Sequence, residues 1–236
     1  MKIFATVLTL LLATSFSARA GEVTIQNILE NLQALHSAAA TQECSNVIEE
    51  SHSKNSAQLF YSAAICAKEK RASDASFLLL AGQIRSTADM GLYAPTSGKD
   101  QEAMGALYGL IFYHFGGAGD QSTYRDRKQY NALQARLAAW EPTRASSYNP
   151  GWHFKSSPRD TKYQQAISSA KQHRFAQLDN YSKLMLDEQY YAAQQELGKL
   201  QSKNPRGFVS DTADGKRSME LLSTMQQRAR EITGDR

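Results

Sequence analysis

The sequence predicts an all-α protein, a compact array or bundle of about eight or nine antiparallel helices with one disulfide across a helical hairpin. Three observations lead to this fold class. Apolar residues recur at spacings of three and four along nearly the whole chain after residue 20. Outside these segments, almost no stretch alternates apolar and polar residues as a β-strand would. The two cysteines lie at equal distances from a polar turn, as expected for neighbouring antiparallel helices.

Residues 1–20 have the composition of a secretory signal peptide. Lys2 supplies a positive charge, and residues 3–14 form an apolar region. Ala18 and Ala20 then place small residues before a cleavage site after Ala20. An apolar region of about twelve residues is too short to span a bilayer core of about 30 Å, although an uncleaved N-terminal anchor is the alternative. We therefore expect export to an oxidising compartment, the bacterial periplasm, and a mature chain without a transmembrane anchor.

Removal of this segment changes the charge of the chain. The full sequence has 27 Lys and Arg residues against 23 Asp and Glu residues. Lys2 and Arg19 are removed with the signal peptide and no acidic residue is, which leaves 25 against 23, a net charge of +2. Lys and Arg form no cluster along the chain, so we expect no nucleic-acid partner.

The first helix of the mature chain is expected at residues 24–39, with Thr24 as its N-cap. Its apolar residues share one helical face: Ile25, Ile28, Leu29, Leu32 and Leu35. This face predicts an amphipathic helix.

The next two helices, expected at residues 41–51 and 56–70, form a hairpin about a polar turn. Residues at equal distances from the turn of such a hairpin face each other, and Cys44 and Cys66 are equidistant from Asn55. An even number of cysteines in an oxidising compartment favours pairing. We therefore expect a Cys44–Cys66 disulfide, and a structural one, because the chain has no Cys-x-x-Cys motif.

Three further helices are expected in the N-terminal half. The first begins after the cap Ser73, spans residues 74–90 and ends at Gly91. The second spans residues 98–115 and ends at two consecutive glycines. The third spans residues 124–140. Its apolar face is formed by Tyr130, Leu133 and Leu137.

Residues 141–158 form a long irregular connection, because prolines recur there and the helical spacing is lost. We expect it to join an N-terminal helical part, residues 21–140, to a C-terminal helical part, residues 159–236, with both packed as one domain. The C-terminal part contains three expected helices, at residues 159–186, 187–203 and 215–232.

The connection also contains the candidate partner-binding residues. Tyr and Trp on a loop that prolines hold in few conformations bury a large area at little cost in entropy. The alternative is that Trp152 and Phe154 fill the groove between the two helical parts. The candidates are Tyr148, Trp152, His153, Phe154 and Arg159.

The sequence has no catalytic or metal-binding signature. The five histidines are scattered, and none has the spacing of a zinc motif. The glycine-rich residues 116–119 follow a helix rather than a strand, and no Lys-Ser/Thr pair follows them. Neighbouring carboxylates such as Glu49 and Glu50 point about 100° apart on a helix. We therefore expect no catalytic residue, no metal site, no cofactor and no enzymatic activity.

Residues 187–193, Asp-Glu-Gln-Tyr-Tyr-Ala-Ala, resemble the start of a tetratricopeptide-type helix, with Leu197, Leu200 and Pro205 following. Residues 61–70 and 74–85 make a similar tight pair, but no 34-residue period links the two regions. The resemblance implies a cell-envelope scaffold or adaptor that binds an extended peptide in a concave groove.

In general character, the chain is similar to the periplasmic immunity proteins that neutralise effectors delivered by type VI secretion, including lipase effectors. The signal peptide, the single cysteine pair and the helical chain without an active site carry this resemblance. It implies a protein partner, a secreted toxin or lipase effector, whose active site is occluded or locked. We expect such a non-enzymatic periplasmic binding protein; the alternatives are the tetratricopeptide-like scaffold and a cryptic envelope hydrolase. The sequence leaves the oligomeric state open.

Overall fold

The computed structural model describes residues 43–93, 98, 102, 122–145, 147–151, 154, 159–204 and 211–234. These residues contain eight helices and no strand, which confirms the all-α prediction. The helices are α3 (Cys44–Glu49), α4 (Ser56–Lys68), α5 (Ala72–Leu92), α7 (Ser122–Arg125), α8 (Arg127–Ala139), α9 (Asp160–Leu186), α10 (Glu188–Lys203) and α11 (Ala213–Thr233). The expected signal peptide, the expected helix at residues 24–39 and most of that at residues 98–115 lie outside the described residues. No helix in the described ranges is long and apolar enough to cross a membrane.

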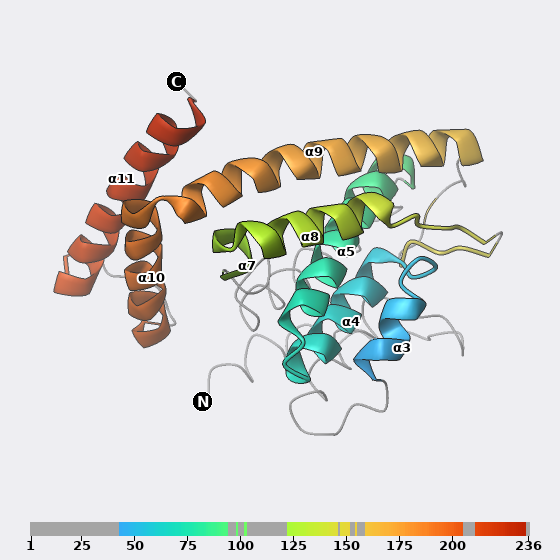
Figure 1. Ribbon diagram of the computed structural model, residues 1–236, viewed down its shortest axis with the longest axis horizontal. Coiled ribbons are helices and arrows are strands. Elements are labelled where there is room, and N and C mark those ends of the chain that lie inside the picture. Colours follow the sequence, from blue (N-terminus) through green and yellow to red (C-terminus); the bar gives the residue numbers. More distant parts are fainter. Residues whose placement is uncertain are drawn as a thin grey trace.

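Helix α5 is the central element and packs against α3, α4, α8 and α9. Helices α4 and α5 lie side by side as a hairpin, and α3 flanks them (Figure 1). Helix α9 crosses α5 and continues to the hairpin of α10 and α11, which stands at the far end of the molecule from α3 (Figure 1). One apolar cluster extends from Cys44 of α3 to Met185 of α9, so the chain before and after the connection contributes to a common core.

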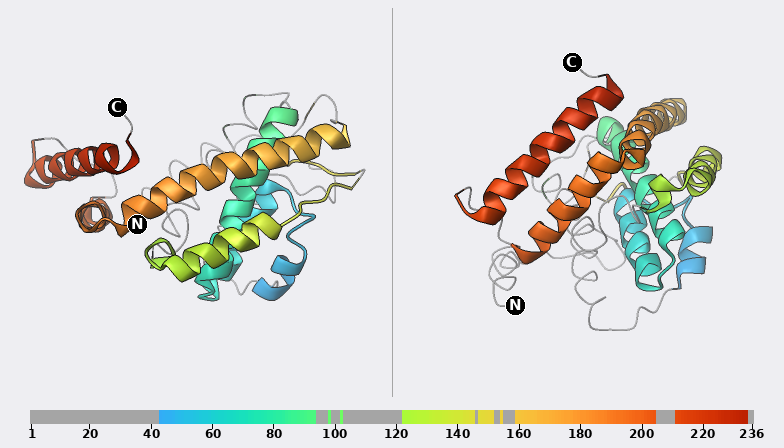
Figure 2. Two further views of the ribbon diagram at one scale, coloured as in Figure 1. Left: turned by 45° about the horizontal axis from the view of Figure 1, so that its top comes forward. Right: turned by 60° about the vertical axis from the view of Figure 1, so that its left-hand side comes forward.

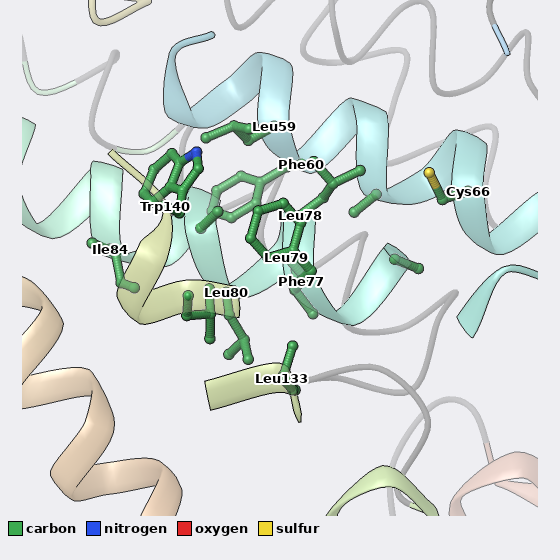
Figure 3. Packing of buried hydrophobic residues seen from close by; sticks show 14 of the residues in the cluster. Leu59, Phe60, Cys66, Phe77, Leu78, Leu79, Leu80, Ile84, Leu133 and Trp140 are labelled. Carbon is green, nitrogen blue, oxygen red and sulfur yellow. The ribbon is translucent and has the colours of Figure 1, made fainter. Parts of the chain in front are cut away.

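The core forms where α4, α5, α8 and α9 meet. Every residue of α5 from Ala75 to Arg85 is buried, because other helices surround this part of it. Figure 3 shows Phe60 of α4 and Trp140, the residue after α8, among the side chains of α5. Gly82 permits this packing, since a Cβ atom there would lie 2.5 Å from the Phe60 ring. The apolar run of α5 is therefore explained by burial on all sides.

Side-chain caps determine where several helices begin. At α4, the Gln58 amide donates to Asn55 Oδ1 at 2.9 Å and the Asn55 amide donates to Gln58 Oε1 at 3.0 Å, a reciprocal capping box. Asp126 accepts hydrogen bonds from the amides of Lys128 and Gln129 and so begins α8. The single helix expected at residues 124–140 is therefore wrong, because the Asp126 cap divides it into α7 and α8.

Helix α5 is longer than expected at both ends. It begins at Ala72, so Ser73 lies inside it rather than capping it. Arg71 precedes the helix, and its Nε donates to Asp74 at 2.7 Å. At the other end the helix continues through Gly91 and ends before the buried Tyr93. The low helix propensity of glycine is a weak preference, which tertiary contacts can override.

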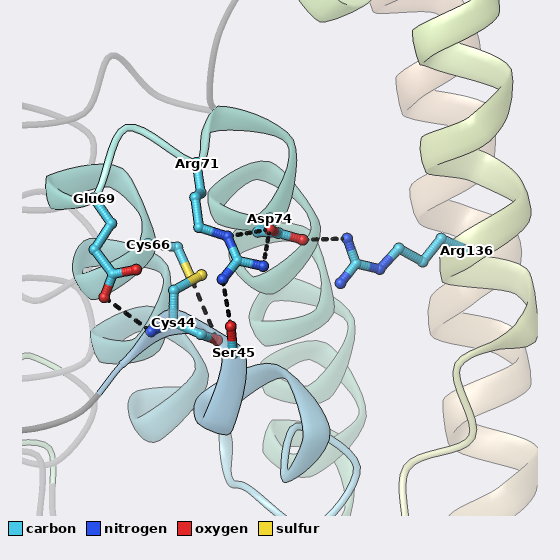
Figure 4. The surroundings of a disulfide bond; sticks show 7 residues. All are labelled: Cys44, Ser45, Cys66, Glu69, Arg71, Asp74 and Arg136. Carbon is cyan, nitrogen blue, oxygen red and sulfur yellow. Dashed lines mark hydrogen bonds and ion pairs between the residues drawn. A yellow bond between two sulfur atoms is a disulfide. The ribbon is translucent and has the colours of Figure 1, made fainter.

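Cys44 of α3 and Cys66 of α4 form the expected disulfide (Figure 4). Their Cα atoms are 4.8 Å apart and both side chains are fully buried. The Cys44 amide donates to Glu69 Oε1 at 2.9 Å, and Arg71 Nη1 donates to Ser45 Oγ at 2.8 Å. Because α3 has only six residues, the disulfide, these polar contacts and the buried Val47 together hold it against its neighbours. Closing a loop of this size stabilises the fold by about 3 kcal/mol.

Candidate functional site

The candidate partner-binding residues of the connection have different surroundings. Tyr148 and Phe154 are half-buried and pack against the core. Arg159 is exposed at the residue that precedes α9. Trp152 and His153 lie outside the described residues. Tyr148 and Phe154 thus attach the connection to the helices, and Arg159 faces solvent.

The connection meets α5 and α9 at a buried polar cluster, which we call the Arg85 cluster. Its members come from α5, the connection and α9: Arg85, Asp89, Tyr93, Arg144, Tyr148 and Tyr163. We did not predict Arg85 and Asp89 as site residues, although two charges one turn apart on a strongly apolar helix are a signal that could have identified them. Both side chains are 0% exposed, so their charges must be offset within the protein.

Arg85 joins three segments of the chain. Its Nη2 donates to the Thr143 carbonyl at 2.9 Å, its Nη1 to the His52 carbonyl at 3.4 Å, and its Nε to the Tyr148 hydroxyl at 2.9 Å. The guanidinium carbon lies 4.3 Å from the centroid of the Tyr148 ring and 5.3 Å from that of Tyr163. All of these partners are neutral. Arg85 is therefore a buried cation that holds the connection against α5.

Asp89 is the carboxyl group beside this cation. Its Oδ2 accepts a hydrogen bond from the Tyr148 hydroxyl and lies 3.7 Å from Arg85 Nε. Its Oδ1 is buried and has no hydrogen-bond partner among the described residues. Burial raises the pKa of Asp89 to about 7; the charge of Arg85, the hydrogen bond from Tyr148 and the charge of Arg144 oppose this rise only in part.

Arg144 closes the side of the cluster next to α9. Its Nη1 donates to the Tyr93 hydroxyl at 2.7 Å, and its Nη2 pairs with Asp160. Its guanidinium carbon lies 5.1 Å from the centroid of the Tyr163 ring, which Arg85 also approaches. Tyr163 is 1% exposed, and its hydroxyl has no hydrogen-bond partner within the described ranges. Burial raises the pKa of Tyr163, so this hydroxyl stays protonated in neutral solution.

The Arg85 cluster is suited to hold the connection against α5 and to exchange one proton with solvent at Asp89. None of its members is a Ser, Cys or His side chain that could serve as an ordinary nucleophile or neutral base. Within the described ranges, no group of three His, Cys, Asp or Glu side chains is placed to hold a metal ion.

The hairpin of α10 and α11 is a second candidate site. A small apolar cluster joins its two helices: Ala193, Leu197, Leu200 and Leu221. Arg217 of α11 donates to both carboxylate oxygens of Glu196, at 2.7 and 2.8 Å. Arg228 pairs with Asp187, whose side chain also caps α10 through the Tyr190 amide. Charged side chains at its surface thus supplement a small core.

Large apolar side chains are exposed at this end of the molecule. Met219 and Leu222, three residues apart on α11, are 62% and 39% exposed, and Leu186 at the end of α9 is 41% exposed. The only other large apolar side chain exposed to this degree in the described ranges is Met90, on α5. Arg217 and Glu220 flank Met219 in the sequence and bind each other at 3.1 Å. Apolar residues bordered by charged ones are the usual composition of a protein-binding surface.

The chain matches no protein-family model, no curated protein and no solved structure. Similarity to known proteins therefore assigns the chain no function. The Arg85 cluster and the hairpin of α10 and α11 are the structural features from which a function can be inferred.

Proposed function

We propose that the protein is an exported, non-enzymatic binding protein that neutralises a toxic effector enzyme in the periplasm. The exposure of Met219 and Leu222 on α11 carries this proposal, because neighbouring apolar side chains on one helix are suited to enter an apolar groove of another protein. The buried Cys44–Cys66 disulfide supports the compartment, since such bonds persist in oxidising environments.

The position of the hairpin supports occlusion of an active site. Helices α10 and α11 stand beyond the end of α9, away from α3, α4 and α5 (Figure 2). A partner can therefore approach α11 without displacing the disulfide-linked helices. Met219 is unbranched and adapts to irregular apolar surfaces, and the Arg217 and Glu220 charges beside it favour one orientation of the partner.

The proposal is tested by co-purification and inhibition. The mature protein should bind a secreted enzyme, such as a lipase encoded beside its gene, and inhibit the purified enzyme at a one-to-one ratio. Met219→Glu with Leu222→Glu should weaken binding by about thirtyfold or more, the loss of about 2 kcal/mol typical of a central contact. Met90→Glu is the control for an added surface carboxylate, because it places one at an exposed methionine of another helix. It should bind as tightly as the unchanged protein.

Two results would contradict the proposal. One is a mature protein that inhibits no secreted enzyme, combined with the loss of an envelope complex when its gene is deleted. The other is hydrolysis of lipid or peptidoglycan by the purified protein itself, abolished by a single carboxylate or serine substitution.

A tetratricopeptide-like scaffold is the second candidate function. Helices α10 and α11 pack against each other, and both contact α9, the arrangement of consecutive helices in such scaffolds. This candidate requires binding of an extended peptide rather than of a folded enzyme. Binding to peptides from envelope proteins, with no inhibition of any secreted enzyme, would favour it.

A further inference from the structure

We propose that the segment 141–151, of which the structure describes residues 141–145 and 147–151, closes over Asp89 with uptake of one proton, so that acid favours its attachment to α5 and a rise in pH weakens it. The inference concerns the Arg85 cluster and is independent of the partner proposed for α11.

The contacts of segment 141–151 reach α5, the turn before α4 and, through the pair of Arg144 with Asp160, α9. Arg85 binds the Thr143 carbonyl and the Tyr148 hydroxyl, and that hydroxyl donates to Asp89. The Thr143 amide donates to the His52 carbonyl at 2.8 Å. Asn55 Nδ2 donates to the Asn149 carbonyl at 3.1 Å. Detachment of the segment therefore breaks the polar contacts of Tyr148 and opens Asp89 to water.

The attached segment leaves the Asp89 carboxylate incompletely compensated. Its Oδ2 accepts from the Tyr148 hydroxyl, its Oδ1 has no partner in the part of the chain that the structure describes, and its side chain is 0% exposed. Arg85 is close, but its hydrogen bonds go to two carbonyls and to the Tyr148 hydroxyl. A buried carboxylate with an unsatisfied oxygen favours its protonated form, whereas a hydrated one is ionised.

The groups around Asp89 come from three elements. On α5 and directly after it are Arg85 and Tyr93; on the segment are Arg144 and Tyr148; on α9 are Tyr163 and Asp160. His52 contributes its backbone carbonyl, and its side chain is exposed. The two arginines favour ionised Asp89. Burial raises the pKa of Tyr93, Tyr148 and Tyr163, so these hydroxyls stay neutral and add no charge.

The direction of the effect follows from proton linkage. Burial raises the pKa of Asp89 from 3.8 to about 7 in the attached state. Between about pH 4 and pH 7 the attached state therefore binds a proton that the detached or unfolded state does not. Its stability is greatest at the acid end of this range, falls as the pH rises, and changes little above about pH 7.

Two measurements on the mature protein test the inference. Carbon-13 NMR of the Asp89 carboxyl should show a midpoint near pH 7. Amide hydrogen exchange, corrected for its intrinsic pH dependence, should show protection of residues 141–151 falling by at least about tenfold between pH 5 and pH 8, the factor for one pKa unit. Asparagine is uncharged and similar in shape to aspartate. The Asp89→Asn variant should therefore show the same protection of residues 141–151 at both pH values.

Asp160→Asn is the matched control, because Asp160 also pairs with an arginine of the cluster but has an exposed side chain. It should keep the pH dependence of the unchanged protein. A carboxyl midpoint near pH 4 in the unchanged protein overturns the inference, whether or not the Asp89→Asn variant folds. An unaltered pH dependence in a folded Asp89→Asn variant also overturns it.

Discussion

The helices around α5 and the hairpin of α10 and α11 are stabilised in different ways. The first region has an apolar cluster that extends over six helices, a buried disulfide and the buried Arg85 cluster. The hairpin has four buried apolar side chains, side-chain caps and ion pairs at its surface. Surface ion pairs contribute at most about 1 kcal/mol each. The comparison indicates that the hairpin is the less stable region, so it can adjust to a partner while the rest stays folded.

The largest effect should come from the centre of the larger region. Phe60→Ala removes a ring that is 1% exposed and packs over Gly82, so it should lower the free energy of unfolding by about 3–5 kcal/mol. Leu197→Ala in the hairpin core should mainly increase hydrogen exchange in α10 and α11. Equal losses of global stability in urea unfolding would show that the two regions unfold as one unit.

Removal of the disulfide should have the next largest effect. Replacing Cys44 and Cys66 together by serine should lower stability by about 3 kcal/mol, because the unfolded chain gains the entropy of an open loop. Hydrogen exchange should increase in α3 and α4 and stay unchanged in α11. An increase throughout α11 would contradict the separation of the two regions.

The smallest effect should come from the cap of α10. Asp187→Ala removes both the cap and the ion pair with Arg228, and should destabilise the hairpin by about 1 kcal/mol. Asp187→Asn keeps a capping side chain and removes the charge, so its effect should be smaller. Peptide-resolved hydrogen exchange of α10 measures both.

Acid should act on the two regions in opposite directions. The hydrogen bond from Arg228 lowers the pKa of Asp187, so its contribution to the hairpin is present above about pH 4 and is lost as the pH falls through that lowered pKa. Acid favours the attachment of segment 141–151 over Asp89 instead. Weaker protection of both regions at pH 3 than at pH 7 would contradict the comparison.

Much of the fold could be predicted because its signals are local. The apolar spacing of residues 159–186 and 187–203 depends only on neighbouring positions, and α9 and α10 follow these ranges within one residue. The disulfide followed from equal distances to one turn. The break at Asp126 was missed although it too is local, because an aspartate can cap a helix or lie on its exposed face.

The candidate sites depended on information that is not local. The exposure of Met219 and Leu222 follows from the side on which α10 packs, since an apolar residue on α11 could have been buried instead. The inward position of Tyr148 depends on Arg85 and Asp89, which lie 63 and 59 residues away in the chain. No spacing rule joins positions so far apart.

The sequence by itself determined that the chain is helical and that its two cysteines pair, because helical periodicity and the symmetry of a hairpin are set by residues close together. Only the tertiary structure decided that residues 75–85 of α5 are covered on all sides, that Tyr148 completes a buried cluster with Arg85 and Asp89, and that α11 presents apolar residues to solvent. The physical reason is that burial and charge compensation depend on which distant segments pack together.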